Sequence, residues 1–489
     1  MTHKNKNTSA GSEKNKSRTG TVNLRAVVLE MLLMMEQETQ YANRLLKATL
    51  DKYDYLTAQD KAFMKRLFEG CTERRIQLDY VINCYSRTKT DKMKPMILEV
   101  LRMGTYQILY MDAVPDSAAC DESVKLVVKR GFSGLKGFVN GVLRTIAREK
   151  DGIKWPDGKA DPVHAMSVRY SMPEWIVSMF IKEHGEDKTK QMLEAFLQEL
   201  PVTVRMDENL PKEQEKQILQ EISEAGIRIE KHPYLPYAYR IKNVSGLHRL
   251  PGFFEGVFQV QDVSSMLVSE IAGIRPGMTV IDVCAAPGGK SLHAACKLNG
   301  TGLVSARDLT PEKTELIRQN AARSGYHNIE ILEQDARQLR TEDVERADIV
   351  YVDAPCSGLG IMGKKCDIRY HMSDSQMQEI VLLQREILRT AVRYVRPGGT
   401  LIYSTCTIHR AENEEQVHFI ESLGFEQEDI WNYLPEKTAE LIRKALEITV
   451  KQDPGNEKDE KDSRGCLQLL PGIHETDGFF MARLRKREQ

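Results

Sequence analysis

Apolar residues recur at helical spacing throughout the first third of the chain. Between residues 22 and 149 they fall three and four positions apart, and signals for strands are nearly absent. The spacing is clearest in two runs: Leu24, Val27, Val28, Met31 and Leu32, then Ile97, Leu98, Leu101, Ile108 and Leu109. Polar and glycine-rich breaks divide the stretch into roughly five to seven helices. The pattern therefore predicts an all-α bundle over residues 21–150.

A second unit with mixed signals follows a short polar connection. Residues 151–165 are rich in glycine, proline and charge, and are predicted to be a linker. After them, helical patterns are interrupted by β-rich runs such as PVTVRM and IRIEKHPYLPYAYRI. Residues 166–255 are therefore predicted to form a small α+β module.

From residue 256 onward, strand and helix patterns alternate. The strand runs are VIDV, LVSARD, IEILEQD, DIVYVDAP and GTLIYSTC, and a helical or loop stretch follows each of them. Such alternation predicts a parallel sheet with helices on both faces, whose ligands bind beyond the carboxyl ends of the strands. The fold class is thus multidomain, ending in an α/β Rossmann-like domain over residues 256–489. The charged run at 451–464 (KQDPGNEKDEKDSR) is predicted to be a surface loop of that domain.

Composition narrows the class of protein. Of 489 residues, 41% are hydrophobic and 28% charged, as in a globular protein, and no apolar run is long enough to span a bilayer. The polar and basic residues 1–20 lack the apolar segment of a secretory signal, so they are predicted to be a disordered tail and the protein is expected in the cytoplasm. Nine cysteines without any C-x-x-C pair argue against a disulfide framework and against a metal site.

The net charge and its distribution along the chain limit how the protein could bind a nucleic acid. The net charge is only −1, so binding to a nucleic acid would have to use a local patch. Residues 85–150 hold 12 Lys or Arg against 7 Asp or Glu, which makes this part of the helical bundle a candidate patch. A solvated helix face would have the same composition, so charge alone leaves the function open.

A glycine turn follows the first strand of the last domain. The segment VIDVCAAPGGKS (280–291) runs from an apolar strand into a turn, where Gly288 and Gly289 let the backbone approach a ligand. Asp308 comes near the end of the next strand, about 20 residues later, and Asp335 ends the third. Carboxylates at neighbouring strand ends can bind ribose hydroxyls and bracket an adenine. An adenosine ligand is therefore predicted, although a tight connection with two capping aspartates would leave the same pattern.

Two thiols and a carboxylate follow the fourth and fifth strands. Asp353 and Cys356 lie in DAPCSG, and Cys406 lies in STCT. Because these strands are adjacent in the usual sheet order, the three side chains are expected in the crevice that holds the adenosine ligand. A thiolate that attacks C6 of cytosine makes C5 nucleophilic, a nearby acid can protonate N3, and a base then removes the C5 proton. The three residues meet those demands, but the pattern does not decide which thiol attacks.

Several ordered motifs, VQDVSS, DVCAAPGGKS, DAPCSGLG, STCT and LLPGIHETDGFFMARL, resemble those of the bacterial ribosomal RNA cytosine-5 methyltransferases of the Sun (Fmu) type. The resemblance covers nearly the whole chain. It implies that Cys406 is the nucleophile, that Cys356 assists product release and that Asp353 serves both base and cofactor. It further implies that the cofactor, S-adenosylmethionine, lies against Asp308, Asp335, Asp353, Cys284, Ala285, Ala286, Pro287, Gly288, Gly289 and Lys290.

The resemblance extends to the two preceding units. The helical part, through FVNGVLRTIAR, resembles the RNA-binding NusB fold, and the middle module, through SMPEWIV and PVTVR, resembles the family's small RNA-contacting domain. In the family, a basic run ending in Pro-Asp follows the Pro-Cys motif. Here it reads GKKCDIRY, with Cys366 in place of proline. Lys364, Lys365 and Arg369 are expected to remain available for phosphates.

The substrate that the resemblance implies is a specific cytosine of small-subunit (16S) ribosomal RNA, as naked or early-assembly RNA bound by a monomer. Related enzymes with the same motifs act on transfer RNA, and the NusB-like domain favours ribosomal RNA over that alternative. A non-catalytic RNA-binding assembly factor would not need Asp353, Cys356 and Cys406 together. A small-molecule methyltransferase would have no use for the two preceding domains.

Overall fold

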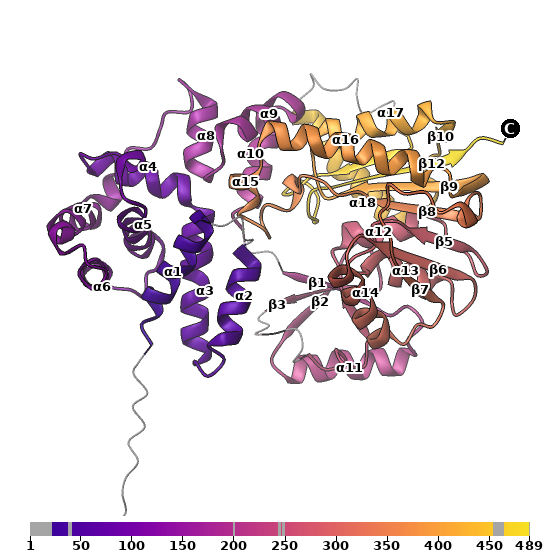
Figure 1. Ribbon diagram of the computed structural model, residues 1–489, viewed down its shortest axis with the longest axis horizontal. Coiled ribbons are helices and arrows are strands. Elements are labelled where there is room, and N and C mark those ends of the chain that lie inside the picture. The colour runs from indigo at the N-terminus through magenta and orange to yellow at the C-terminus, as the bar shows by residue number, and fades with distance from the viewer. Residues whose placement is uncertain are drawn as a thin grey trace, which may run out of the picture.

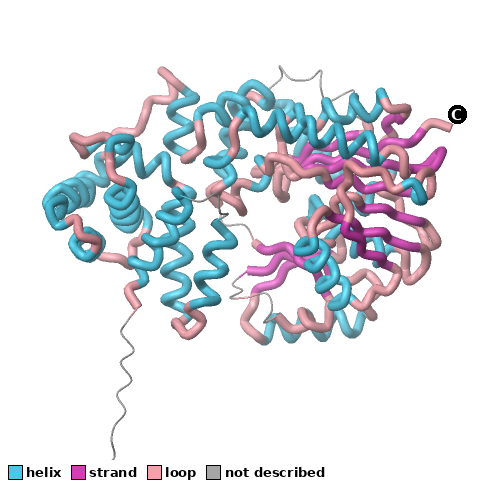
Figure 2. The backbone as a smooth tube through the Cα atoms, viewed as in Figure 1, coloured by secondary structure: helices cyan, strands magenta, loops and turns pink. Residues whose placement is uncertain are grey.

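The chain forms three units in a computed structural model that describes residues 22–37, 42–198, 201–242, 246, 250–452 and 464–488 (Figure 1). A helical unit occupies one end of the molecule, a larger sheet with helices on both faces occupies the other, and a small sheet lies between them (Figure 2). The predicted tail at 1–20 and most of the predicted loop at 451–464 lie outside the described residues. Within them, no helix is both long and apolar enough to cross a membrane.

The amino-terminal unit is all-α, as the helical spacing predicts. Its central helix is α5, which packs against α1, α3, α4, α6 and α7. Every residue of α5 from Ile97 to Ile108 is buried except Leu98, because a helix surrounded by neighbours has no solvent face. The helices of the unit are α1 (Leu24–Gln37), α2 (Ala42–Lys52), α3 (Ala58–Glu73), α4 (Arg75–Tyr85), α5 (Pro95–Tyr110), α6 (Asp116–Lys129) and α7 (Lys136–Glu149).

The middle module has a four-stranded antiparallel sheet in the order β2-β3-β1-β4, covered by one helix. Its outer strand β4 pairs with β1, so the strand lies in this sheet although the predicted last domain begins before it, at residue 256. Apolar side chains of α11 and of the strands form its core. Its elements are β1 (Val202–Met206), α11 (Lys212–Glu224), β2 (Arg228–Lys231), β3 (Ala238–Lys242) and β4 (Phe258–Val260).

Three helices precede that sheet: α8 (Pro162–Tyr170), α9 (Glu174–His184) and α10 (Glu186–Ala195). The first begins inside the predicted linker, because Asp161 caps it and Pro162 occupies its first turn. Phe180 and Met192 of this group share an apolar core with Met362 and Ile408 of the last unit. The three helices therefore pack against the larger sheet domain, whereas the small sheet has a core of its own.

The last unit is the predicted α/β domain with a mostly parallel sheet, in the order β10-β12-β9-β8-β5-β6-β7. The strands are β5 (Thr279–Asp282), β6 (Leu303–Asp308), β7 (Ile329–Glu333), β8 (Ala347–Asp353), β9 (Val395–Thr405), β10 (Phe425–Gln427), β11 (Cys466–Leu469) and β12 (Phe479–Lys486). The helices are α12 (Val263–Ile271), α13 (Gly289–Lys297), α14 (Pro311–Ser324), α15 (Ile368–His371), α16 (Asp374–Ala391), α17 (Glu414–Ser422) and α18 (Glu436–Gln452). One face packs on α12, α13 and α18, and the other on α16 and α17.

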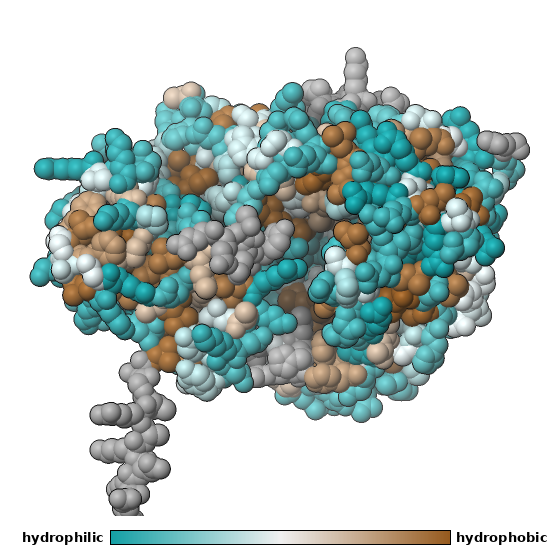
Figure 3. Space-filling view, in the orientation of Figure 1, coloured by the Kyte–Doolittle hydropathy of each residue, from teal (hydrophilic) through white to brown (hydrophobic). Residues whose placement is uncertain are grey.

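The strand order sets the place of the functional edge. From β5 the chain moves to β6 and β7 on one side, then returns to β8 and β9 on the other, so the direction reverses between β5 and β8. Ligands of doubly wound sheets bind at the carboxyl ends of the strands beside such a reversal. In the space-filling view a hollow lies between part of the helical unit and the α/β unit (Figure 3). The strand order therefore predicts a ligand site at the carboxyl ends of β5, β6, β8 and β9.

Candidate active site

The Sγ atoms of Cys356 and Cys406 lie 3.2 Å apart just beyond the carboxyl ends of β8 and β9. The two strands pair in parallel with Asp353 opposite Ser404, so the loops that follow them leave the sheet side by side. The Ser404 hydroxyl donates to Asp353 Oδ1 at 2.8 Å. The structure thus brings together the carboxylate and the two thiols, as the predicted strand order requires.

The contact between the thiols separates their acidities. The hydrogen bond from Cys356 lowers the pKa of Cys406, in opposition to burial and the charge of Asp353, and Lys365 and Lys290 lower this pKa further. The same hydrogen bond, together with burial, raises the pKa of Cys356 well above its usual range. A thiolate is the reactive form of cysteine, so these shifts favour Cys406 as the nucleophile.

Lys290 joins the thiol pair to the glycine turn. Its ammonium lies 2.7 Å from Asp353 Oδ2 and 5.2 Å from the centroid of the Phe479 ring, and the side chain is largely buried. Asp353 is therefore held at both oxygens, by Lys290 and by Ser404. A carboxylate fixed in this way can present one defined hydrogen-bonding direction to a base that enters beside Cys406.

The turn between β5 and α13 is held in place by Asp308. Gly288 has a φ of 106°, a backbone conformation that favours glycine, and α13 begins at the next residue. Asp308 Oδ2 accepts from the N–H of Ala286 at 2.9 Å, and Oδ1 accepts from the Lys313 ammonium at 2.9 Å. Asp308 thus lies directly against the turn, as the sequence predicts, and helps to shape it.

Asp335 lies at the same edge of the sheet. The N–H of Gln334, the residue before it, donates to the backbone oxygen of Asp308 at 2.9 Å, and Arg337 binds both carboxylate oxygens of Asp335. Two carboxylates on adjacent strand ends, beside helix N–H groups and a glycine turn, fit the ribose and adenine of an adenosyl cofactor.

A buried polar clamp holds the two thiol loops together, and the sequence analysis missed it. Glu412 is fully buried and accepts from the N–H of Ser357 at 2.8 Å and from the Ser357 hydroxyl at 2.6 Å. The Ser357 hydroxyl also contacts Thr407 at 2.8 Å. Asn413 accepts from Thr405 at 2.6 Å and donates to the Thr407 carbonyl oxygen at 3.2 Å. These hydrogen bonds fix the positions of the residues next to both cysteines. The only sequence signal is a Glu-Asn pair shortly after STCT.

Comparison with known proteins bears on the whole chain. A family model described as 16S rRNA methyltransferase RsmB/F matches residues 273–485. Models for the NusB family and for an RsmF/B-like ferredoxin-like domain match residues 22–148 and 172–247. A Bacillus subtilis protein named probable ribosomal RNA small subunit methyltransferase B is 35% identical over 95% of this chain and 99% of its own length. The chain belongs to the RsmB/F methyltransferase family.

Further relatives and solved structures agree with this membership. A Synechocystis protein of the same name is 31% identical over 95% of this chain and its entire length. The crystal structure of PH0851 covers 95% of this chain and 99% of its own with a TM-score of 0.74 at 23% identity. NSun6 from Pyrococcus horikoshii with SFG covers 65% of this chain and 99% of its own, with a TM-score of 0.55 at 20% identity. At these identities the two structures support the fold. The resemblance and the three-unit fold class predicted from the sequence are confirmed.

One residue of the GKKCDIRY loop, Arg369, does not have the role predicted for it in this RsmB/F family member. The Lys364 ammonium lies 3.0 Å from Asp262 and 2.6 Å from Asp477, and Arg369 is 1% exposed and donates to backbone oxygens. The prediction that Arg369 would be available for phosphates is therefore wrong, because its side chain is buried and bonded inside the fold. Lys364 is ion-paired but 40% exposed, so its availability stays a prediction. Lys365 remains exposed.

Among the described residues, one group has the composition of a metal site. Glu208, Glu270 and His293 bring their ligand atoms close together beside α13. The ammonium of Lys297 lies 2.7 Å from Glu270 and 3.4 Å from Glu208, and burial lowers the pKa of His293 well below its usual range. A lysine cation already compensates these carboxylates, so the group is a salt-bridge cluster that has no link to the thiol pair.

Proposed function

We propose that this RsmB/F family member transfers a methyl group from S-adenosylmethionine to carbon 5 of a cytosine in small-subunit ribosomal RNA. The observation that carries the proposal is the pair of thiols 3.2 Å apart, beside a fixed carboxylate and on the sheet edge that bears the glycine turn. Family membership supports RNA as the substrate class, because relatives of the full length are named ribosomal RNA small subunit methyltransferase B.

Each of the three site residues, Cys406, Asp353 and Cys356, has its own role in the reaction. The Cys406 thiolate attacks C6 of the cytosine and forms an S–C6 bond, which places electron density on C5. The cofactor, when bound against the turn and Asp308, supplies the electrophilic methyl group. Asp353 meets the ring at N3, where a proton is needed as C6 is attacked. Cys356 assists release: its thiolate accepts the C5 proton, the electron pair of that C–H bond restores the C5–C6 double bond, and the S–C6 bond breaks to regenerate the Cys406 thiolate.

Bisulfite mapping tests the proposed function. Small-subunit rRNA transcribed in vitro is incubated with the full chain and S-adenosylmethionine, and transfer RNA is treated in parallel. We expect one cytosine of the ribosomal RNA to become resistant to deamination and none to do so with Cys406→Ala. Resistance confined to transfer RNA would favour the alternative substrate, and methyl transfer to a base other than cytosine would refute the proposal.

Two stretches of the helical unit, at the turns before α5 and between α6 and α7, are rich in basic residues. The stretch 86–94 holds four basic residues and one acidic one, and 125–136 holds four basic residues and no acidic one. The Lys94 ammonium lies 5.2 Å from the centroid of the Phe132 ring, which joins the two stretches into one surface. Phosphates of an RNA strand are the natural partners of such a surface. We propose that a monomer binds naked or early-assembly RNA here.

The double variant Lys129→Glu/Lys136→Glu is expected to weaken RNA binding. Both lysines are exposed, and each lost phosphate contact lowers the slope of log affinity against log salt by about one. Filter binding across a salt series measures the slope. The control Lys437→Glu/Lys444→Glu makes the same charge change on exposed positions of α18 and should leave the slope unchanged. Equal losses of RNA affinity in both double variants would show that binding depends on net charge and not on this surface.

A further inference from the structure

The two loops that bear the thiols are joined by side chains as well as by backbone. One backbone bond runs from the N–H of Ala354 to the oxygen of Ser404, at 3.0 Å. Another runs from the N–H of Gly360 to the oxygen of Cys406, also at 3.0 Å. Neither bond involves the residues next to Cys356, so the position of this thiol depends on contacts made by side chains.

Ser357, the residue after Cys356, makes the side-chain connection. Its hydroxyl lies 2.8 Å from the Thr407 hydroxyl and 2.6 Å from Glu412 Oε1, and its N–H donates to Glu412 Oε2 at 2.8 Å. A carboxylate is an acceptor only, so the Ser357 proton points to Glu412 and the Ser357 oxygen is left to accept from Thr407. Because Thr407 follows Cys406, the residue after each thiol belongs to one chain of hydrogen bonds that ends on Glu412.

Glu412 is itself held by a helix and a strand. The amide of Gln384, on α16, donates to Glu412 Oε2 at 3.3 Å and to the carbonyl oxygen of Pro355 at 3.0 Å. The Tyr403 hydroxyl, on β9, donates to the backbone oxygen of Glu412 at 2.6 Å. Gln384 and Tyr403 are fully buried. Both neighbours of Cys356 in the sequence are therefore bound to one fixed group of buried side chains.

We propose that Glu412 is a positioning residue, whose hydrogen bonds to the loop after β8 hold Cys356 against Cys406 for the two steps of the reaction. The inference rests on the proposed function only in giving each thiol a step. Attack occurs at C6 and proton removal at C5, which are neighbouring atoms, so both sulfurs must stay close to one ring. Apolar side chains could pack such loops without a penalty, whereas a carboxylate is costly to bury unless donors surround it.

Phenylarsine oxide tests the separation of the thiols without RNA. Its arsenic forms a bond to each sulfur, both thiols give up their protons, and the oxide oxygen leaves as water. A disulfide would instead require the sulfurs to approach from 3.2 Å to about 2.05 Å. The affinity of the full chain for the arsenical is measured by competition with dithiothreitol, and peptide mapping by mass spectrometry locates it. Cys406→Ala should lose the tight site, which identifies the thiol pair as that site.

The variants of the clamp are expected to bind the arsenical less tightly, because the second thiol then has a lower effective concentration. Ser357→Ala should lower the affinity by about three- to tenfold, and Glu412→Ala by about tenfold or more. Glu412→Gln should stay near the parent value. Its carbonyl oxygen can accept where Oε2 does, and its NH₂ group can donate to Ser357, whose own proton then turns to Thr407.

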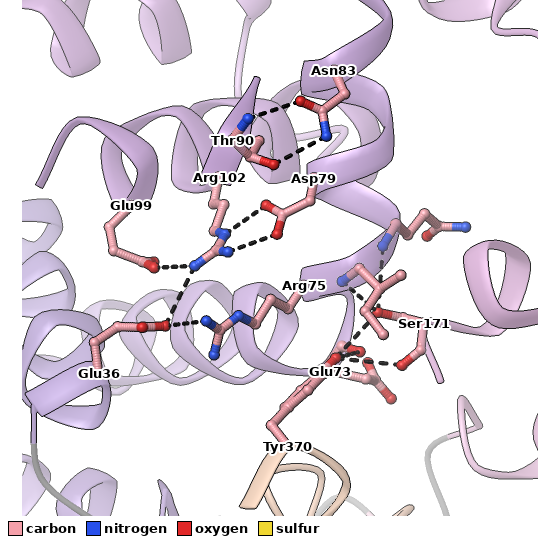
Figure 4. Close-up of polar contacts among 12 residues, drawn as sticks. Glu36, Glu73, Arg75, Asp79, Asn83, Thr90, Glu99, Arg102, Ser171 and Tyr370 are labelled. Atoms are coloured by element: carbon pink, nitrogen blue, oxygen red, sulfur yellow. Dashed lines mark hydrogen bonds and ion pairs between the residues drawn. The ribbon is translucent and has the colours of Figure 1, made fainter. Parts of the chain in front are cut away.

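Ser171→Ala is the matched control. Ser171 is 1% exposed, accepts from the N–H of Ile76 at 3.0 Å and contacts the Tyr370 hydroxyl at 3.2 Å (Figure 4). Like Ser357 it is a buried serine bonded to an N–H and to a hydroxyl, but it joins α4 to α15. Its affinity for the arsenical should equal that of the parent chain. In methyl transfer, Ser357→Ala should lower kcat by about three- to tenfold with KM for RNA unchanged.

An arsenical affinity of Ser357→Ala equal to that of Ser171→Ala would overturn the inference. Equal losses in Glu412→Gln and Glu412→Ala would overturn it as well, because the effect would then belong to the charge of the carboxylate. If Glu412→Ala fails to fold, Ser357→Ala and Glu412→Gln still decide. A chain that shows the expected affinities but methylates no RNA would refute the proposed function and leave the positioning of the thiols standing. A chain that methylates RNA with equal affinities in all clamp variants would do the reverse.

Discussion

We expect that replacing Cys406 by alanine abolishes methyl transfer, whereas replacing Cys356 still permits the attack and traps the protein on its RNA. Without Cys406 no S–C6 bond forms and C5 stays too electron-poor to react, so the rate falls by on the order of 10⁴-fold or more. Without Cys356 the attack still proceeds, although more slowly, because Cys406 loses the hydrogen bond that lowers its pKa but keeps the charges of Lys365 and Lys290. Release then fails, and a covalent adduct accumulates.

Denaturing gels of each variant with RNA and S-adenosylmethionine measure the adduct as a band of reduced mobility. Cys366→Ala is the control, because this thiol lies in the neighbouring loop, half-buried, and burial raises its pKa to about 12. It should methylate normally and form no stable adduct. An adduct with Cys406→Ala, but not with Cys356→Ala, would reverse the two roles.

The convergence of the site was predictable from the sequence because it depends on few steps. Apolar runs fix the strands, alternation with helices makes them parallel, and the usual strand order places the ends of β8 and β9 together. Asp353, Cys356 and Cys406 follow those two strands directly, so their meeting depends on no long loop. Asp308 is similar, since it ends the strand beside the glycine turn.

Features that depend on pairing between distant segments could not be predicted from the sequence. β4 resembles the start of the α/β domain in sequence, and only its ladder with β1 places it in the small sheet. The antiparallel strands β10 and β12, which complete the larger sheet, were not predicted. Arg369 looks like a surface cation, but Ser171, whose carbonyl oxygen accepts from it, lies 198 positions away along the chain. Sequence alone cannot show that a charge will be buried against such a partner.

The burial of Glu412 in the clamp could not be predicted from the sequence either. A glutamate in a polar stretch is normally exposed, and burial of a carboxylate is costly unless donors surround it. Here Ser357 and Gln384 supply those donors, from the loop after β8 and from α16. Neither partner is near Glu412 in sequence. The thiols were therefore predictable as residues, whereas the scaffold that fixes their separation was not.

Asp308→Ala is expected to raise the Kd for S-adenosylhomocysteine by about 100-fold, the equivalent of losing two charge-assisted hydrogen bonds. The carboxylate has two functions that alanine removes together. It accepts from the N–H of Ala286 and so holds the glycine turn, and it is the predicted partner of the ribose hydroxyls. Asp308→Asn keeps one acceptor oxygen, so its Kd should lie between that of the parent chain and that of Asp308→Ala. Isothermal titration calorimetry with the full chain measures each Kd.

Asp348→Ala provides the matched comparison, because this aspartate occupies the opposite, amino end of the strands. It accepts from the N–H of Thr279 at 2.8 Å and from Arg396 at 2.7 Å, so its loss costs the sheet similar hydrogen bonds far from the glycine turn. If the edge of the sheet decides cofactor binding, the Kd stays unchanged in this variant and rises only in the Asp308 series. A similar rise in both would mean that cofactor affinity reports the general stability of the sheet, and Asp308 would lose its place in the adenosine site.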